Sequence, residues 1–76
     1  MKPFKKYNPK TFKTKRLVCN LTLQEIADIC RVSRQTIGNI EHDRLSSGPS
    51  ITLVGLALDM IAEEKGLTKV FEALEK

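Results

Sequence analysis

Histidine, cysteine and aromatic residues are scarce in this chain, and their scarcity excludes several kinds of site. Two cysteines in 76 residues do not make a disulfide framework. Cys19 and Cys30 each fall where a predicted helix needs an apolar residue, so we expect two free thiols in the core. With a single histidine, His42, a four-ligand zinc site would also need carboxylates, and no ligand spacing indicates one. We therefore expect no metal ion and no other cofactor.

Long apolar runs are absent as well. The most apolar stretch, residues 51–62, is interrupted by Thr52, Gly55 and Asp59 and is shorter than the roughly 20 residues that cross a bilayer. No apolar run follows the lysines near the start of the chain, so no secretory signal is predicted. We expect a cytoplasmic protein with no membrane partner.

Catalytic chemistry has little support. A domain of this length buries only about 60% of its unfolded surface, which leaves little room for a deep pocket beside a core. His42 has no nearby cysteine or pair of acids in a plausible pocket, and no glycine-rich loop that cradles a phosphate is present. The sequence therefore predicts neither an enzyme nor a small-molecule substrate.

Acidic residues are missing from the front of the chain, where none precedes Glu25. Residues 1–44 carry ten Lys or Arg against four Asp or Glu, whereas residues 45–76 carry three against five. This asymmetry predicts a polyanionic partner on one face, although a solvated basic tail has the same charges. We expect a flexible basic arm at residues 1–8 and a single domain at residues 9–76.

Alternation of period two is also lacking, so no strand is predicted, and helical periodicity with clear end signals takes its place. Thr22 with Glu25 makes a capping box, and Ser33 is a second N-cap. Gly66 is a C-terminal cap, and Thr68 is expected to cap a short last helix. The other helices are expected at residues 9–19, 22–30, 33–42 and 50–65.

The helix at residues 33–42 has two different faces. Ile37 and Ile40 lie on one side, and Arg34, Gln35 and Asn39 lie on the other. Arginine donates twice to guanine, and glutamine or asparagine pairs with adenine, so these three are predicted base readers, against the alternative of a solvated helix face. The predicted contacts to the DNA backbone, which fix register without reading sequence, are Ser33, Thr36, Lys13, Lys15, Arg31 and His42.

Two short runs carry a family resemblance. Residues 21–27 read LTLQEIA and residues 32–37 read VSRQTI. Together they resemble the second helix, turn and recognition helix of the Cro/repressor family of helix-turn-helix domains, also called XRE-like or lambda-repressor-like. Glu41 resembles the acid that closes the family's third helix, and Arg16 the basic residue of helix 1 that pairs with it. Residues 49–51 resemble the start of helix 4.

The resemblance implies an all-α, five-helix bundle that binds duplex DNA in a sequence-specific manner and regulates transcription. It fits a small repressor of Cro type from a phage or mobile element, acting in a bacterial or phage-infected bacterial cell, often as a two-fold dimer. The chain departs from the family pattern at Leu23, where glutamine is usual, and at Arg31, where glycine is usual. Gly38 lies within the recognition helix and costs about 1 kcal/mol relative to alanine.

Two further predictions concern contacts between elements. Arg16 and Glu41 are expected to form a partly buried ion pair, because an acid at a helix C-terminus is disfavoured by the dipole unless a cation faces it. The last helix carries an apolar stripe that is expected either to bind a protein or to pack in the core: Leu67, Val70, Phe71 and Leu74. The partner would be a second copy or another regulator, and in the latter case the chain is an interaction module that binds a repressor or toxin, with weak DNA binding of its own.

Overall fold

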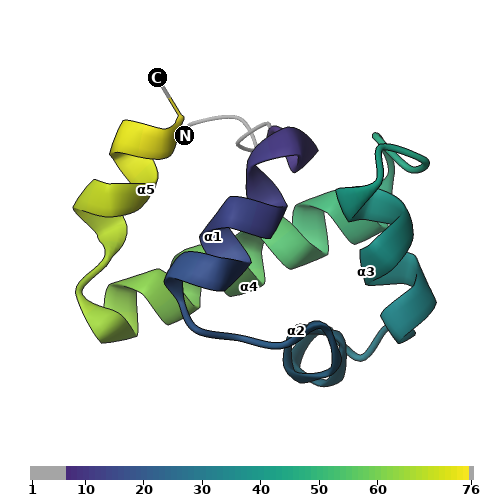
Figure 1. The fold of residues 1–76 in the computed structure, drawn as a ribbon, viewed down its shortest axis with the longest axis horizontal. Coiled ribbons are helices and arrows are strands. Elements are labelled where there is room, and N and C mark those ends of the chain that lie inside the picture. The colour runs from purple at the N-terminus through teal and green to yellow at the C-terminus, as the bar shows by residue number, and fades with distance from the viewer. Residues whose placement is uncertain (1–6, 76) are drawn as a thin grey trace.

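The computed structural model describes residues 7–75, and within that range the chain is all-helical, with five α-helices behind a short 3-10 turn and no β-strand. This confirms the all-α prediction. Most of the expected basic arm lies outside the described residues. In chain order the elements (Figure 1) are η1 (Pro9–Thr11), α1 (Phe12–Val18), α2 (Leu23–Cys30), α3 (Arg34–Glu41), α4 (Pro49–Lys65) and α5 (Thr68–Leu74).

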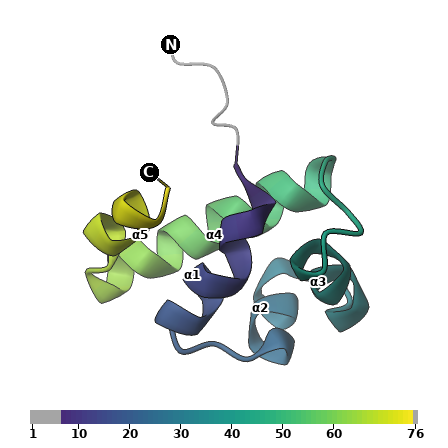
Figure 2. The ribbon, with the colours of Figure 1, turned by 45° about the horizontal axis from the view of Figure 1, so that its top comes forward.

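The longest helix, α4, runs through the molecule and packs against α1, α2 and α5. In Figures 1 and 2, α1 lies across α4, α2 and α3 lie toward one end of α4, and α5 lies at the other end. Ala27 is fully buried, and its small side chain suits the close contact that α2 makes with its neighbours. The core takes residues from all five helices: Phe12, Cys19, Ile26, Ala27, Cys30, Ile37, Ile40, Ile51, Val54, Leu58, Ala62 and Phe71.

The helix ends follow the predicted local hydrogen bonds. Thr22 accepts from the backbone N–H of Glu25 at 3.1 Å, and the Glu25 carboxylate accepts from the backbone N–H of Thr22 at 2.9 Å. This confirms the capping box of α2. Ser33 caps α3, and Gly66 ends α4 in the left-handed conformation with φ of 72°. Arg31 ends α2 in the same conformation, with φ of 56°.

The start of α5 differs from the prediction. Thr68 is its first helical residue rather than its cap, and Leu67 holds the N-cap position without a side-chain hydrogen bond. The backbone N–H of Leu67 donates to the Ala62 carbonyl at 2.7 Å, while its own carbonyl accepts from the N–H of Phe71 at 3.0 Å. Because this one residue both closes α4 and opens α5, no position is left for a separate cap.

Tyr7 shows that the globular part begins before residue 9. Its side chain is half-buried against the core, with its ring edge toward Phe12 at a centroid distance of 6.4 Å. The same ring packs on Gly55 of α4, where an added Cβ would overlap the ring atoms. Tyr7, which the sequence analysis places in the arm, therefore packs on the helical domain, where its ring covers a glycine far along the chain.

Candidate nucleic-acid interface

The start of α3 is fixed by the hydroxyl groups of Ser33 and Thr36, both of which the sequence predicts as contacts to the DNA backbone. Ser33 Oγ accepts from the backbone N–H of Thr36 at 3.1 Å, and the two side-chain oxygens share a hydrogen bond of 2.8 Å. An N-cap of this kind satisfies one of the free N–H groups of the first helical turn. The structure thus gives Ser33 and Thr36 a role in shaping the helix start, from which Arg34 and Gln35 project.

Burial separates the two faces of α3 as the sequence predicted. Ile37 and Ile40 are each 2% exposed and point into the core. Arg34 and Gln35 are exposed, and Asn39 is partly exposed. The three predicted base-reading residues therefore share the outer side of one helix whose inner side is anchored.

These side chains line a groove beside α3. The α3 groove holds about 350 Å³ and is lined by Leu23, Arg34, Gln35, Gly38, Asn39, His42 and Arg44. No acidic side chain lines it. The groove therefore combines cations and amide groups with access from solvent, which suits a polyanion that presents hydrogen-bonding edges.

Arg44 belongs to this groove although the sequence reading did not select it. Asp43 has φ of 60° and turns the chain back at the end of α3. The backbone N–H groups of Arg44 and Leu45 then donate to the Asn39 carbonyl at 2.8 and 3.2 Å. This turn brings the Arg44 guanidinium back beside α3. The only sequence signal for this position was a cationic residue shortly after the end of a predicted helix.

A second hollow continues the surface toward α1. It holds about 510 Å³ and is lined by Arg16, Leu17, Asn20, Leu21, Thr22, Leu23, Gln24 and Arg34. Leu23 and Arg34 line both hollows. Arg34 therefore stands at the middle of a continuous concave surface that extends from the end of α1 past the start of α2 to α3.

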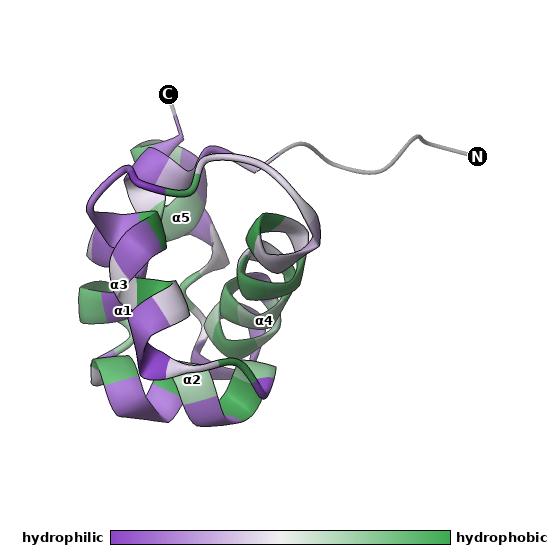
Figure 3. Ribbon diagram, turned by 90° about the vertical axis from the view of Figure 1, so that its right-hand side faces the viewer, coloured by the Kyte–Doolittle hydropathy of each residue, from purple (hydrophilic) through white to green (hydrophobic). Residues whose placement is uncertain are grey.

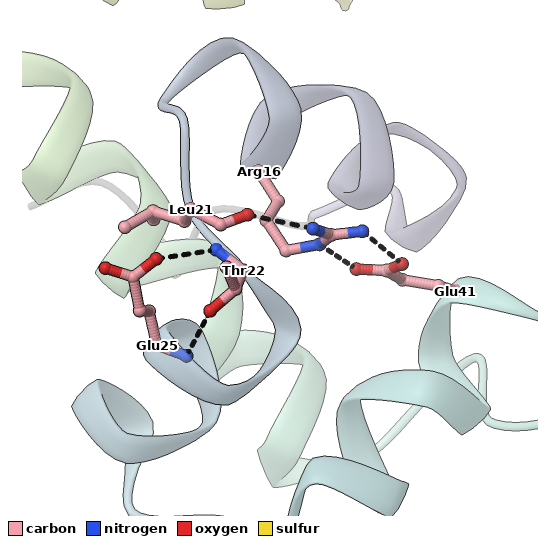
Figure 4. A network of polar contacts seen from close by, with 5 residues as sticks. All are labelled: Arg16, Leu21, Thr22, Glu25 and Glu41. Atoms are coloured by element: carbon pink, nitrogen blue, oxygen red, sulfur yellow. Dashed lines mark hydrogen bonds and ion pairs between the residues drawn. The ribbon is translucent and has the colours of Figure 1, made fainter.

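The expected ion pair between Arg16 and Glu41 is present and holds this surface together (Figure 4). Arg16 Nε donates to Glu41 Oε2 at 2.7 Å and Nη2 donates to Oε1 at 3.1 Å, while Nη1 donates to the Leu21 carbonyl at 2.8 Å. The two side chains are 10% and 6% exposed. One guanidinium thus fixes the C-terminal end of α3 and the turn before α2 relative to α1.

Lys15 is a correction to the predicted DNA-backbone contacts. It is 1% exposed, and its Nζ lies 2.7 Å from Glu75 and 5.2 Å from the centre of the Phe71 ring. Lys15 shares the inner face of α1 with Phe12 and Cys19, so its side chain runs inward and not toward solvent. A phosphate has no access to this ammonium group.

The remaining predicted backbone contacts lie in different places. His42 is exposed and lines the α3 groove. Lys13 on α1 and Arg31 at the end of α2 are exposed but line neither hollow. The structure therefore brings one of these three residues to the groove.

The stripe on α5 is mostly core. Phe71 is 3% exposed, Leu67 and Leu74 pack against the core, and only Val70 is exposed. The interface reading of Phe71 is wrong, because α5 folds back over the C-terminal half of the bundle and uses this ring to close it.

Exposed apolar side chains gather instead on α2 and α4, in a surface that we call the α2–α4 face. It forms a groove of about 540 Å³ lined by Ile29, Cys30, Leu53, Leu56, Ala57, Met60, Ile61 and Glu64. Met60 is 66% exposed, the most of the large exposed apolar residues. Figure 3 shows hydrophobic residues along the outer side of α4.

The chemistry of the thiols and acids offers no second kind of site in residues 7–75. Cys19 and Cys30 are free and buried, and desolvation raises the pKa of both thiols, although Lys65 opposes the rise at Cys19. Among the described residues, no group of three or more His, Cys, Asp or Glu side chains is placed to hold a metal ion. No helix of this part of the chain has the length and apolar character to cross a membrane.

Comparisons of the chain with protein-family models, with curated proteins and with solved structures found no match.

Proposed function

We propose that this chain is a sequence-specific, duplex-DNA-binding transcriptional regulator in which α2 and α3 form a helix-turn-helix and α3 enters the major groove. The observation that carries the proposal is the acid-free α3 groove, in which Arg34, Gln35 and Asn39 lie beside His42 and Arg44. The bidentate pair between Arg16 and Glu41, which resembles that of Cro-type repressors, supports the same reading. A repressor of a phage or mobile element is the form of regulator that this resemblance favours.

The groove residues divide the work of recognition. Arg34 donates two hydrogen bonds to O6 and N7 of a guanine, and Gln35 or Asn39 pairs with N6 and N7 of an adenine. Arg44 and His42, at the edge of the groove, contact phosphates and fix the register of α3. The buried Ile37 and Ile40 keep the helix from rotating while it reads.

The regulator acts as a weak dimer through the α2–α4 face. Leu53, Leu56 and Met60 form a row along one helix, and a row on one helix pairs with itself when two copies meet antiparallel about a two-fold axis. With the axis beside Leu56, Leu53 of one copy faces Met60 of the other. Glu64 then approaches the start of α4 in the other copy, where the helix dipole favours an acid.

The test is equilibrium binding of the chain to a random pool of duplex DNA at low and at moderate salt, followed by selection of the bound duplexes. We expect binding that falls steeply with salt, because cations released from the phosphates drive association. The selected sequences should share a motif, repeated about 10 base pairs away if a dimer reads two half-sites. Absence of binding at low salt would contradict the proposal and favour a module that binds another protein.

A further inference from the structure

Gly38 lies within α3, yet nothing in the fold requires glycine there. Its φ is not in the left-handed region, unlike those of Gly48 and Gly66. A Cβ added at Gly38 meets no atom within 4 Å, whereas at Gly55 it would overlap the ring of Tyr7. Glycine weakens a helix interior relative to alanine. Folding therefore does not explain this residue, and the missing side chain leaves part of the α3 groove open.

Leu23 borders the same open space and gives it an apolar wall. Among residues 7–75 it is the only large apolar side chain that lines the α3 groove, and it is partly buried against the core. Because α2 begins at this residue and its first turn is held by the capping box, Leu23 is fixed in place. Leu23 and Gly38 are thus the two residues of the groove lining without a polar side chain, and the others carry arginine, histidine and amide groups.

We propose that the part of the groove beside Leu23 and Gly38 receives the C5 methyl group of a pyrimidine, which is thymine in unmodified DNA. The inference rests on the proposed function and extends it to one base of the recognised site. The thymine methyl is the one apolar group among those by which the major groove identifies its base pairs, and every other such group there donates or accepts a hydrogen bond. 5-Methylcytosine carries the same methyl group at the same position and is the second possible source.

The first experiment removes or adds this methyl group in the DNA. Duplexes selected by the wild-type chain are resynthesised with deoxyuridine in place of each thymine in turn. We expect one thymine per half-site at which the change weakens binding about fourfold, which is the effect of one buried methyl group. Cytosine and 5-methylcytosine are then placed at that position. Tighter binding of 5-methylcytosine than of thymine would identify the methylated base as the preferred ligand.

The second experiment changes the protein. Gly38→Ala is expected to raise Tm by about 4–8 °C, because alanine favours the helix and its Cβ has room. The same Cβ occupies the space for the methyl group, so binding to the thymine site should fall roughly tenfold. Val70→Ala, an exposed change on α5 to a better helix former, is the matched control and should leave DNA binding unchanged.

Leu23→Ala links the two experiments. Binding of this variant to the thymine and deoxyuridine duplexes is measured at a temperature at which circular dichroism shows that the variant is folded. The two duplexes should then bind equally well. Duplex binding with no dependence on any thymine methyl, or a Gly38→Ala variant that binds as well as wild type, overturns this inference alone. A wild-type chain that binds no duplex overturns the proposed function and this inference together.

Discussion

Arg34 lines both hollows of the candidate interface. Among the proposed base-reading residues, it is therefore the one whose loss should affect DNA binding most. We expect Arg34→Ala to weaken binding to the selected site by about 1–3 kcal/mol and to relax the choice of base at one position. Lys69→Ala removes the same charge from α5, away from both hollows, and is the matched control. Equal weakening by Arg34→Ala on selected and on random duplexes would leave this residue with a phosphate contact only.

The ion pair of Lys15 and Glu75 joins α1 to the end of α5, and its contribution to stability can be tested by changing each partner. Glu75→Gln removes the carboxylate from a buried ammonium group and should lower the free energy of unfolding by about 1–3 kcal/mol. Lys15→Met keeps most of the volume without the charge, and its cost should be small because the remaining Glu75 carboxylate is 32% exposed and can be hydrated. In that background Glu75→Gln should cost little. Urea unfolding of the four proteins measures this, with Glu72→Gln as the exposed control on α5.

If Glu75→Gln costs as much in the Lys15→Met background as in the wild type, the two side chains are not coupled and Glu75 stabilises α5 through other contacts. Glu75 takes part in further interactions. In the Lys15→Met background, Glu75→Gln should therefore still lower the free energy of unfolding, but by less than in the wild type.

Single residues also show where reading a sequence succeeds and where it fails. The pair of Arg16 and Glu41 was predictable, because an acid at a helix C-terminus needs a facing cation, and the family resemblance indicated Arg16, 25 residues earlier on α1. Lys15 was not, since its burial depends on an acid 60 residues later that only the folding of α5 brings near. A lysine is rarely buried without such a partner, so exposure was the natural expectation for it.

The start of α2 makes the stability of an element depend on pH. Hydrogen bonding from Thr22, chiefly its backbone N–H, lowers the pKa of the Glu25 carboxyl group. A carboxyl pKa that is lower in the folded state adds stability above the pKa of the unfolded chain, and this stability is lost as pH falls through the folded-state pKa. We expect the capping box to contribute fully above about pH 5 and to fade in stronger acid.

Glu25→Gln tests this directly, because glutamine still accepts the Thr22 hydrogen bond but does not titrate. Thermal unfolding of both proteins is followed from neutral pH to about pH 3. The advantage of the wild type should be largest at neutral pH and should vanish or reverse in acid, while Glu72→Gln corrects for the loss of a carboxylate outside a cap. A constant difference across this range would show that the capping hydrogen bond does not depend on ionisation.

The elements themselves were largely predictable, since the starts of α2 and α3 and the end of α4 depend on residues next to them. Thr22, Ser33 and Gly66 each have the cap that their residue type favours. The α3 groove was predictable only in part, because Leu23 and Arg44 reach it from other segments. The sequence shows that residues 50–65 are more apolar than one buried helix face requires. It does not show which side of α4 the last helix leaves uncovered.

At the scale of the whole molecule, the chain presents two surfaces of opposite character. The α3 groove is polar and free of acids, whereas the α2–α4 face is apolar with one acid at its edge. The α3 groove is formed mainly by α3, and the α2–α4 face mainly by α4. Helix α2 contributes Leu23 at its start to the groove, and Ile29 and Cys30 at its end to the face. A second copy seated on the α2–α4 face therefore leaves the outer side of α3 open to DNA.

The small area of the α2–α4 face predicts a weak dimer, and its exposed position predicts that a substitution there can abolish the dimer without unfolding the chain. The exposed side chains of the α2–α4 face offer on the order of a few hundred Å² of apolar surface, against about 800 Å² per partner in a stable complex. We therefore expect sedimentation to show a dimer that dissociates on dilution. Met60→Glu should remain monomeric and folded at every concentration, because it places a charge against the apolar Leu53 of the other copy.

Two further variants decide between this face and α5. Val70→Glu places the same charge on an exposed apolar residue of α5 and should dimerise like the wild type. Phe71→Asp should unfold, since the ring is 3% exposed and a carboxylate there has no partner to replace its hydration. Dimerisation that survives Met60→Glu and is lost in folded Val70→Glu would move the interface to α5. A wild type that stays monomeric throughout would contradict the homodimer and leave the α2–α4 face for a different protein.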